Sequence, residues 1–165
     1  MKILIISDTH GADQNVSRVL KAEEPVDMMI HLGDIEGTEE RLRRMPGIKT
    51  AVFMVRGNND FFSQLEREQE ISIGPHKALL VHGHQYGVSM GTEVLREEAI
   101  ARGCDMAMFG HTHRPFYKKE GGVAILNPGS LSFPRQEGRT PSYIIMEMQD
   151  NGEYEVFIKY IRARG

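Results

Sequence analysis

The chain has 165 residues, of which 40 % are hydrophobic and 26 % are charged, a composition typical of globular proteins. Its length fits one domain of ordinary size, so we expect a single domain that spans 1–165. The net charge of −3 does not favour a nucleic-acid-binding face, and no apolar run approaches the ~20 residues of a membrane span.

The first half of the chain alternates apolar runs with amphipathic segments. Residues 2–7 (KILIIS) form a continuous apolar run, as in a strand buried on both faces, and no cleavage site of a signal peptide follows it. Residues 15–24 carry apolar side chains at helical spacing, and Pro25 ends this predicted helix. The same reasoning predicts strands at 26–34 and 50–55 and a short helix at 37–45, with Thr38 as its candidate N-cap.

The second half of the chain is richer in strands. A charged run at 64–70 is interpreted as solvated surface. The elements predicted next are a strand pair at 70–74 and 76–83, a helix at 91–103 with Thr92 near its start, and a strand at 105–110. From residue 115 onward we predict only strands, at 116–120, 123–127, 142–148 and 154–161, with a hairpin turn between the last two. Strand–helix alternation followed by a strand-rich end indicates two stacked sheets flanked by helices.

The cysteine content bears on the compartment. Cys104 is the only cysteine, so no disulfide forms within the chain. This usage favours a reducing compartment, and we expect a cytoplasmic protein. Cys104 itself precedes a predicted strand and is interpreted as an inert small apolar residue.

Polar side chains follow the carboxyl ends of five predicted strands. In a sheet of mostly parallel strands these ends lie along one edge, where open α/β sheets bind their ligands. Two residues spaced i, i+2 on an extended strand end point the same way, because the strand period is two. We therefore expect these side chains to converge on one site. They are, in chain order, Asp8 and His10, then Asp34, then Asn58, Asn59 and Asp60, then His82 and His84, then His111 and His113.

The chemistry of these side chains points to metal binding. Carboxylates and imidazoles together suit divalent ions such as manganese, iron, cobalt, nickel and zinc. The ligand supply exceeds what one ion needs, and Asp34 could bridge two ions. A two-metal site would clamp a phosphate and generate a hydroxide nucleophile. Because the two ions bring more charge than Asp8 and Asp34 neutralise, the centre would favour an anionic substrate such as a phosphate ester.

The motif series also carries a family resemblance. D-x-H, G-D, G-N-x-D, H-G-H and G-H-T-H, in this order, resemble the calcineurin-like metallophosphoesterase superfamily. The short chain and NPGS at 127–130 are similar to its small bacterial and archaeal phosphodiesterase branch. The resemblance implies an αββα sandwich of two mixed β-sheets flanked by helices. It also implies two metal ions, with manganese as the first expectation. One ion would be held by Asp8, His10, Asp34 and His113, and the other by Asp34, Asn58, His82 and His111.

The activity implied by the resemblance is that of a metal-dependent phosphodiesterase, in which a metal-bound hydroxide attacks a small phosphate ester. One alternative is a phosphomonoesterase or nucleotide phosphatase on the same centre. A second is a non-enzymatic protein-interaction scaffold, as in the retromer subunit that resembles this fold. We expect neither a membrane nor a nucleic acid as partner, given the acidic balance of charge. A homo-oligomer formed through the final strands is a further option.

Asn59 departs from the family pattern, since many members have a histidine there that is thought to protonate the leaving group. An amide can orient a phosphate oxygen, but it cannot deliver a proton as an imidazolium does. We assign Asn59 to the catalytic set in this orienting role. Asp60 joins the set as the residue that would orient an imidazole at position 59.

Several residues also have structural interpretations. Asp8 and Asp34 are common types for caps and turns, and the histidines of the motifs could be packed core residues. His84 is interpreted as a surface or supporting residue. The remaining expectations are a core role for His31, a solvated turn for His76, and either pocket lining or turn formation for Asn127 and Ser130.

Overall fold

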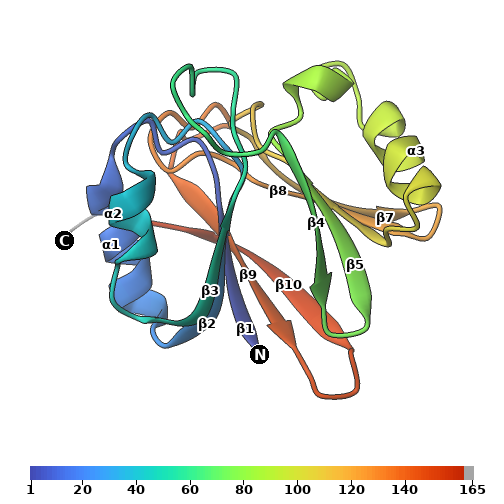
Figure 1. The fold of residues 1–165 in the computed structure, drawn as a ribbon, viewed down its shortest axis with the longest axis horizontal. Helices are drawn as coiled ribbons and strands as arrows, with labels where there is room; N and C mark the ends of the chain where they lie inside the picture. The colour runs from blue at the N-terminus through green and yellow to red at the C-terminus, as the bar shows by residue number, and fades with distance from the viewer. Residues whose placement is uncertain (162–165) are drawn as a thin grey trace.

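Two five-stranded mixed sheets pack face to face in the computed structural model, which describes residues 1–161 (Figure 1). The first sheet has the order β10-β9-β1-β2-β3 and contains β1 (Lys2–Ile6), β2 (Val26–His31), β3 (Ile48–Met54), β9 (Ser142–Met148) and β10 (Tyr154–Tyr160). The second has the order β4-β5-β6-β8-β7 and contains β4 (Glu68–Ile73), β5 (His76–Val81), β6 (Met106–Met108), β7 (Pro115–Glu120) and β8 (Val123–Pro128).

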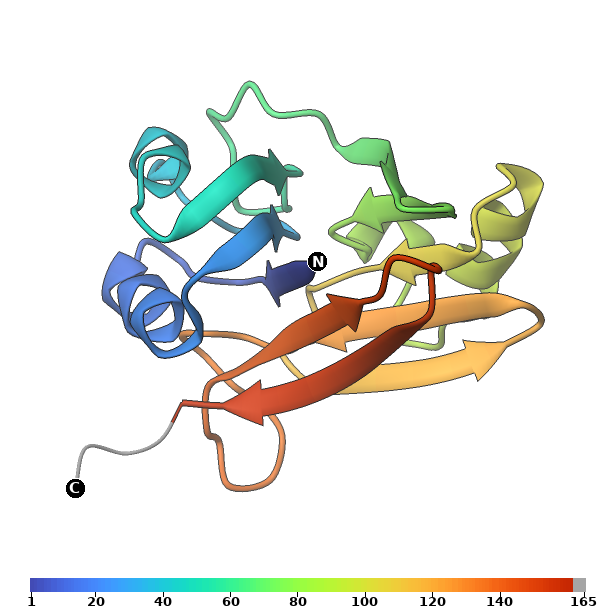
Figure 2. The same cartoon turned by 90° about the horizontal axis from the view of Figure 1, so that it is seen from below.

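Helices cover the outer faces of both sheets. They are α1 (Asp13–Glu23), α2 (Glu39–Arg43) and α3 (Glu93–Ala101), with a 3₁₀ turn, η1 (His84–Tyr86), after β5. Figure 2 shows α1 and α2 on one side of the molecule and α3 on the other, with the two sheets between them. The predicted αββα sandwich is therefore confirmed. No helix of residues 1–161 is long and apolar enough to cross a membrane.

The burial of β1 explains its continuous apolar sequence. Ile3 and Ile5 point into the core between the sheets, whereas Leu4 and Ile6 point into the core under α1 and α2. All four side chains are fully buried, and burying each contributes about 1.5–3 kcal/mol. Because both faces of the strand are covered, a polar residue is tolerated only past its end, and this is where the polar motif begins.

Three neighbouring strands run parallel in each sheet, in the middle of the second sheet and at the β3 edge of the first. In the first sheet β1, β2 and β3 run parallel, and in the second β5, β6 and β8 do. The antiparallel strands β9, β10, β4 and β7 pair outside them. The carboxyl ends of five parallel strands, β1, β2, β3, β5 and β6, therefore carry the loops with the predicted site residues.

The two histidines outside the motifs behave differently. His31 is buried in β2 as predicted; its Nδ1 accepts from Gly33 N, its Nε2 lies 2.9 Å from Thr9 Oγ1, and burial lowers its pKa to about 4. The solvated turn predicted for His76 is wrong. His76 begins β5, and its ring lies 2.6 Å from Asp105 Oδ2 and 2.8 Å from the Gly152 carbonyl, so both ring nitrogens are engaged.

Two smaller expectations changed, for Thr38 and for the charged run at 64–70, whereas Thr92 lies at the start of α3 as predicted. Thr38 and Thr92 occupy the N-cap positions of α2 and α3, but neither side chain makes a cap hydrogen bond. Thr38 instead donates to Asp13 of α1. The charged run at 64–70 is only partly solvated surface, because Glu68 lies in β4 and pairs with Arg102 at 2.7 Å. Cys104 is buried against apolar neighbours, as expected.

Candidate functional site

The site residues lie on left-handed turns rather than on extended strand ends. β1 ends at Ile6, so Asp8 and His10 lie beyond it. Of the seven non-glycine residues of the described chain that have positive φ, five are predicted ligands: Asp8 (53°), His10 (44°), Asp34 (56°), His111 (65°) and His113 (58°). The extended geometry expected for the D-x-H and H-T-H pairs is therefore wrong. A left-handed residue other than glycine costs of order 1–3 kcal/mol and persists where surrounding contacts impose it.

Backbone hydrogen bonds join the loops that follow β1 and β2. Asp8 N donates to Gly33 O and His10 N donates to Asp34 O, each at 3.0 Å. This pairing brings the Asp8 and His10 side chains beside Asp34. The loops also approach closely at Gly57, where a Cβ atom would lie 2.1 Å from Asp34 Oδ1. Only glycine fits that contact, which accounts for the glycine of the G-N-x-D motif.

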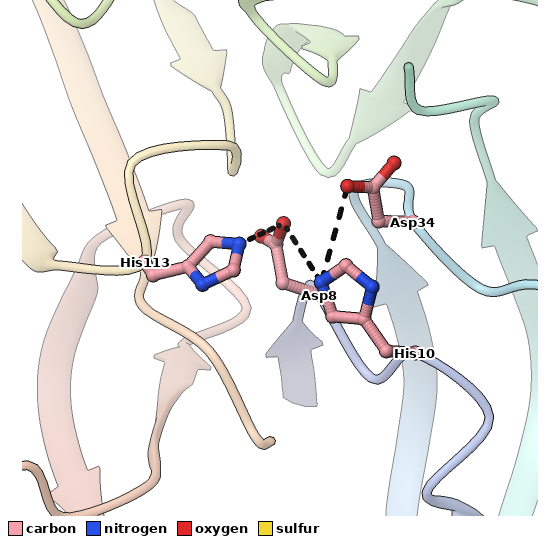
Figure 3. A group of neighbouring side chains, drawn as sticks. All are labelled: Asp8, His10, Asp34 and His113. Carbon is pink, nitrogen blue, oxygen red and sulfur yellow. Dashed lines mark ion pairs between the residues drawn. The ribbon is translucent and has the colours of Figure 1, made fainter. Parts of the chain in front are cut away.

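Four predicted ligands form a compact cluster. Each of Asp8, His10, Asp34 and His113 offers one ligand atom, and these atoms all lie within 4.8 Å of one another (Figure 3). His113 Nε2 lies 3.0 Å from Asp8 Oδ1. His10 Nε2 lies 3.9 Å from Asp8 Oδ1 and 3.9 Å from Asp34 Oδ2. The cluster is the set that the family resemblance assigns to one metal ion.

The orientation of the imidazoles fits a cation at this cluster. The ring Nδ1 of His82 lies 2.6 Å from Leu32 O, and that of His113 lies 2.7 Å from Phe133 O. Since a carbonyl only accepts, each Nδ1 carries the proton and each Nε2 turns a lone pair toward the carboxylates. Asp8 Oδ1, His10 Nε2 and His82 Nε2 are buried without a hydrogen-bond partner in the described part of the chain. Converging lone pairs repel one another unless a cation lies between them, so these residues fit a divalent ion.

The carboxylates are held in their charged form. Burial on its own would raise the pKa of Asp8, but His113 and His82 outweigh burial and lower it. For Asp34, burial is likewise outweighed by His82 and by hydrogen bonds from Asn59, and its pKa is lowered. Burial on its own would lower the pKa of His82, but Asp34 and Asp8 outweigh burial and raise it.

The second predicted ligand set is adjacent but less compact. His82 Nε2 lies 3.5 Å from Asp34 Oδ2, and the His82 and His111 rings are 5.2 Å apart. The Asn58 amide oxygen faces His111 Nδ1 at 3.0 Å rather than Asp34. His84 lies beside this set, with its ring 5.6 Å from that of His82 and its Nδ1 unpartnered among residues 1–161.

Asn59 and Asp60 contact the site through Asp34 and its loop. Asn59 donates twice to Asp34, from its backbone N–H to Oδ1 at 2.9 Å and from its side-chain amide to Oδ2 at 2.7 Å. The buried carboxylate of Asp60 accepts backbone N–H bonds of 2.7–2.8 Å from four residues: Asp34, Ile35, Glu36 and Gly57. Asp60 thus fixes the two loops that carry Asp34 and Asn58.

Of the residues that support the site, Glu36 and Phe133 escaped the sequence analysis, whereas Asn127 and Ser130 were named there. Glu36 lies 2.7 Å from His10 Nδ1, and Phe133 supplies the carbonyl for His113. Asn127 and Ser130 are fully buried, so they shape loops rather than line a pocket. Asn127 donates to Gly110 O at 2.9 Å, and Ser130 donates to Asp8 O at 2.8 Å. The NPGS segment was a usable signal for these two, whereas nothing in the local sequence marks Glu36 or Phe133.

Comparisons with known proteins agree with this geometry. Residues 1–151 match the sequence profile of the calcineurin-like phosphoesterase superfamily domain. The chain is 34 % identical over 152 residues to the probable metallophosphoesterase YsnB of Bacillus subtilis, covering 92 % of this chain and 86 % of that protein. It is 27 % identical over 169 residues to the phosphodiesterase YfcE of Escherichia coli, covering 89 % and 88 %. The structure of Vps29 from Entamoeba histolytica complexed with Zn²⁺ has a TM-score of 0.75 at 23 % identity, covering 97 % and 99 %, which shows likeness of fold.

Proposed function

The chain belongs to the calcineurin-like phosphoesterase superfamily, and from that premise we propose that it is a metal-dependent phosphodiesterase acting on a small phosphate ester. The observation that carries this proposal is the convergence of imidazole lone pairs on two ionised carboxylates. His113 Nε2 and Asp8 Oδ1 are 3.0 Å apart, and His82 Nε2 and Asp34 Oδ2 are 3.5 Å apart. The four side chains of these two pairs are buried, and their lone pairs are available to a cation.

We assign two ions to the site. One would be held by Asp8, His10, Asp34 and His113, and the other by Asp34, Asn58, His82 and His111. When bound, two divalent ions, with manganese preferred over nickel, iron, cobalt or zinc, supply positive charge for the phosphate oxygens and a hydroxide nucleophile near neutral pH. Asn58 and His111 belong to the same set, and Asn58 Oδ1 and His111 Nδ1 lie 3.0 Å apart.

The chain's own residues keep this centre in place. The carbonyls of Leu32 and Phe133 fix the tautomers of His82 and His113, so that both Nε2 atoms stay unprotonated. Asn59 holds both oxygens of Asp34, and its second amide hydrogen is free to orient a phosphate oxygen. We also propose that the protein is cytoplasmic, because a single cysteine is typical of a reducing compartment.

The proposal is tested with bis(4-nitrophenyl) phosphate and 4-nitrophenyl phosphate, a diester and a monoester with the same leaving group. Protein that is stripped with EDTA and reconstituted with manganese should hydrolyse the diester faster than the monoester. Protein that is stripped and not reconstituted should hydrolyse neither. Faster turnover of the monoester would replace the proposal with the phosphatase alternative. Absence of bound metal together with absence of hydrolysis would favour the scaffold alternative, which fits the likeness of fold to Vps29.

The two histidines of the G-H-T-H motif should serve different ions. His113→Ala should lose the ion near Asp8 and spare the ion near His82, because His113 Nε2 faces Asp8 Oδ1 at 3.0 Å. His111→Ala should do the reverse, because its ring lies beside that of His82. Anomalous scattering from crystals of the two variants gives the occupancies. Loss of the same ion in both variants would contradict the assignment.

A steep dependence of turnover on the leaving group follows from Asn59. No imidazolium stands at this position to protonate an alkoxide, and general-acid assistance is typically worth about 10²–10⁴-fold. Activated aryl diesters should therefore be far better substrates than alkyl diesters. Asn59→His should raise the rates on poor leaving groups and flatten this dependence, as measured with a series of substituted aryl phosphodiesters. A shallow dependence in the wild type would mean that another group donates the proton.

A further inference from the structure

We propose that a cavity beside the metal centre, lined by Arg56, Arg67 and His84, binds a second anionic group of the substrate. We call it the arginine pocket. The inference rests on the proposed function and narrows its substrate class to phosphodiesters that carry an additional phosphate or carboxylate on one of their two ester groups. This second anion is distinct from the phosphorus that is attacked.

The arginine pocket adjoins the predicted metal ligands. Its volume is about 340 Å³, and Asn58 and His84 line it together with the two arginines. Asn58 belongs to the second ligand set, and the His84 ring lies 6.0 Å from that of His111. One ester group of a phosphodiester bound at the metal centre could therefore reach into this pocket.

Backbone pairing places the two arginines together. Arg56 follows β3, and its N–H donates to Glu66 O at 2.8 Å. Gln69 in β4 donates from its side chain to Met54 O at 2.9 Å, so the segment before β4 runs along the end of β3. Arg67 lies within this segment. Arg67 and His84 both line the arginine pocket.

The guanidinium groups of Arg56 and Arg67 have no carboxylate partner among residues 1–161. Nearby Arg102 shows the contrasting state, because it pairs with Glu68 at 2.7 Å and with Glu98 at 2.6 Å. The acidic residue that lines the arginine pocket is Asp60, and its oxygens are already engaged by four backbone N–H groups. Arg56 and Arg67 also line a neighbouring cavity of about 640 Å³ that contains Glu66, Glu68 and Glu70, but in the described part of the chain neither guanidinium forms an ion pair with these carboxylates. Planar guanidinium groups suit phosphate and carboxylate oxygens.

The other cavities beside the site differ in charge. A cavity of about 820 Å³ adjoins Asn59, and its lining carries more acidic than basic side chains. They include Glu36, Glu39, Glu40 and Arg43. A cavity of about 760 Å³ near Thr112 contains Arg135 and other basic residues, but Glu93 and Glu120 line it as well. Of these three cavities, the arginine pocket is the one that contains a predicted metal ligand together with arginines that form no ion pair among residues 1–161.

The test compares two substrates with the same scissile bond. They are thymidine 5′-(4-nitrophenyl phosphate) and its 3′-phosphorylated form, which carries the additional anion. With manganese-loaded protein, kcat/KM should be about 10- to 100-fold higher for the 3′-phosphorylated substrate, the range of a charge-assisted hydrogen bond. Arg67→Met should bring this ratio close to one, and Arg67→Lys should retain part of it. Arg135→Met removes the same charge from the other basic cavity and should keep the full ratio.

Two outcomes would overturn the inference. One is a wild-type ratio near one, and the other is a ratio that Arg67→Met leaves unchanged or that Arg135→Met lowers equally. Binding to the metal-free protein separates this failure from failure of the proposed function. In calorimetry, thymidine 3′,5′-bisphosphate should bind at least about 10-fold more tightly than thymidine 5′-phosphate, and Arg67→Met should abolish the difference. Equal affinities would refute the arginine pocket even if neither substrate were hydrolysed.

Discussion

Asp34→Asn should lower turnover of an aryl phosphodiester by at least about 100-fold and weaken both metal ions together. Asp34 Oδ2 lies 3.5 Å from Nε2 of His82 and 3.9 Å from Nε2 of His10, which belong to different ligand sets. The substitution removes a negative charge that both ions would share. It also replaces one acceptor oxygen by an amide donor next to Asn59, which itself donates to that carboxylate.

The measurement combines metal content by mass spectrometry with turnover under saturating manganese. Asp13→Asn is a matched control, because Asp13 is also a buried carboxylate but bonds to Thr38 and Arg41 away from the cluster. This control should retain two ions per chain. Full occupancy with near-normal turnover in Asp34→Asn would rule out a bridging role.

Asp60→Ala should destabilise the metal-free protein by more than about 3 kcal/mol. The substitution strips acceptors from four backbone N–H groups, those of Asp34, Ile35, Glu36 and Gly57. A buried donor left unsatisfied costs about 1–3 kcal/mol, and water entering the space recovers part of that loss. Asp60→Asn should cost less, because its remaining carbonyl oxygen still accepts.

Urea unfolding in EDTA measures this effect without a contribution from bound metal. Asp13→Ala is the control, since Asp13 accepts from one hydroxyl and forms an ion pair with the exposed Arg41, and no backbone N–H among residues 1–161 donates to its side chain. It should cost clearly less than Asp60→Ala. A loss below about 1 kcal/mol for Asp60→Ala would mean that the two loops hold their shape without this carboxylate.

The sequence was sufficient to predict the sheets and the location of the site. Apolar runs such as 2–7 are buried on both faces, and polar residues follow directly where that burial ends, so the strand ends could be recognised locally. The convergence of Asp8, His10, Asp34 and His113 followed from the parallel arrangement of the strands.

The contacts that orient the site could not be predicted in the same way. Glu36 and Phe133 reach the imidazoles from loops whose path depends on the packing of both sheets. The role of Asp60 depends on three N–H groups from a loop 24 to 26 residues away. The left-handed backbone of the ligand residues was also missed, because period-two reasoning holds only while a strand continues.

Those left-handed turns also bear on how the chain would change if its chemistry were no longer selected. Five of the residues that hold them are Asp or His, where glycine would adopt the same φ without strain. A lineage that kept the fold only as a binding surface would relieve this backbone strain by exchanging such residues for glycine. The same substitutions would then remove the catalytic side chains and relieve the strain of the backbone. Aspartate and histidine at these turns therefore carry a backbone strain that only the use of their side chains would offset.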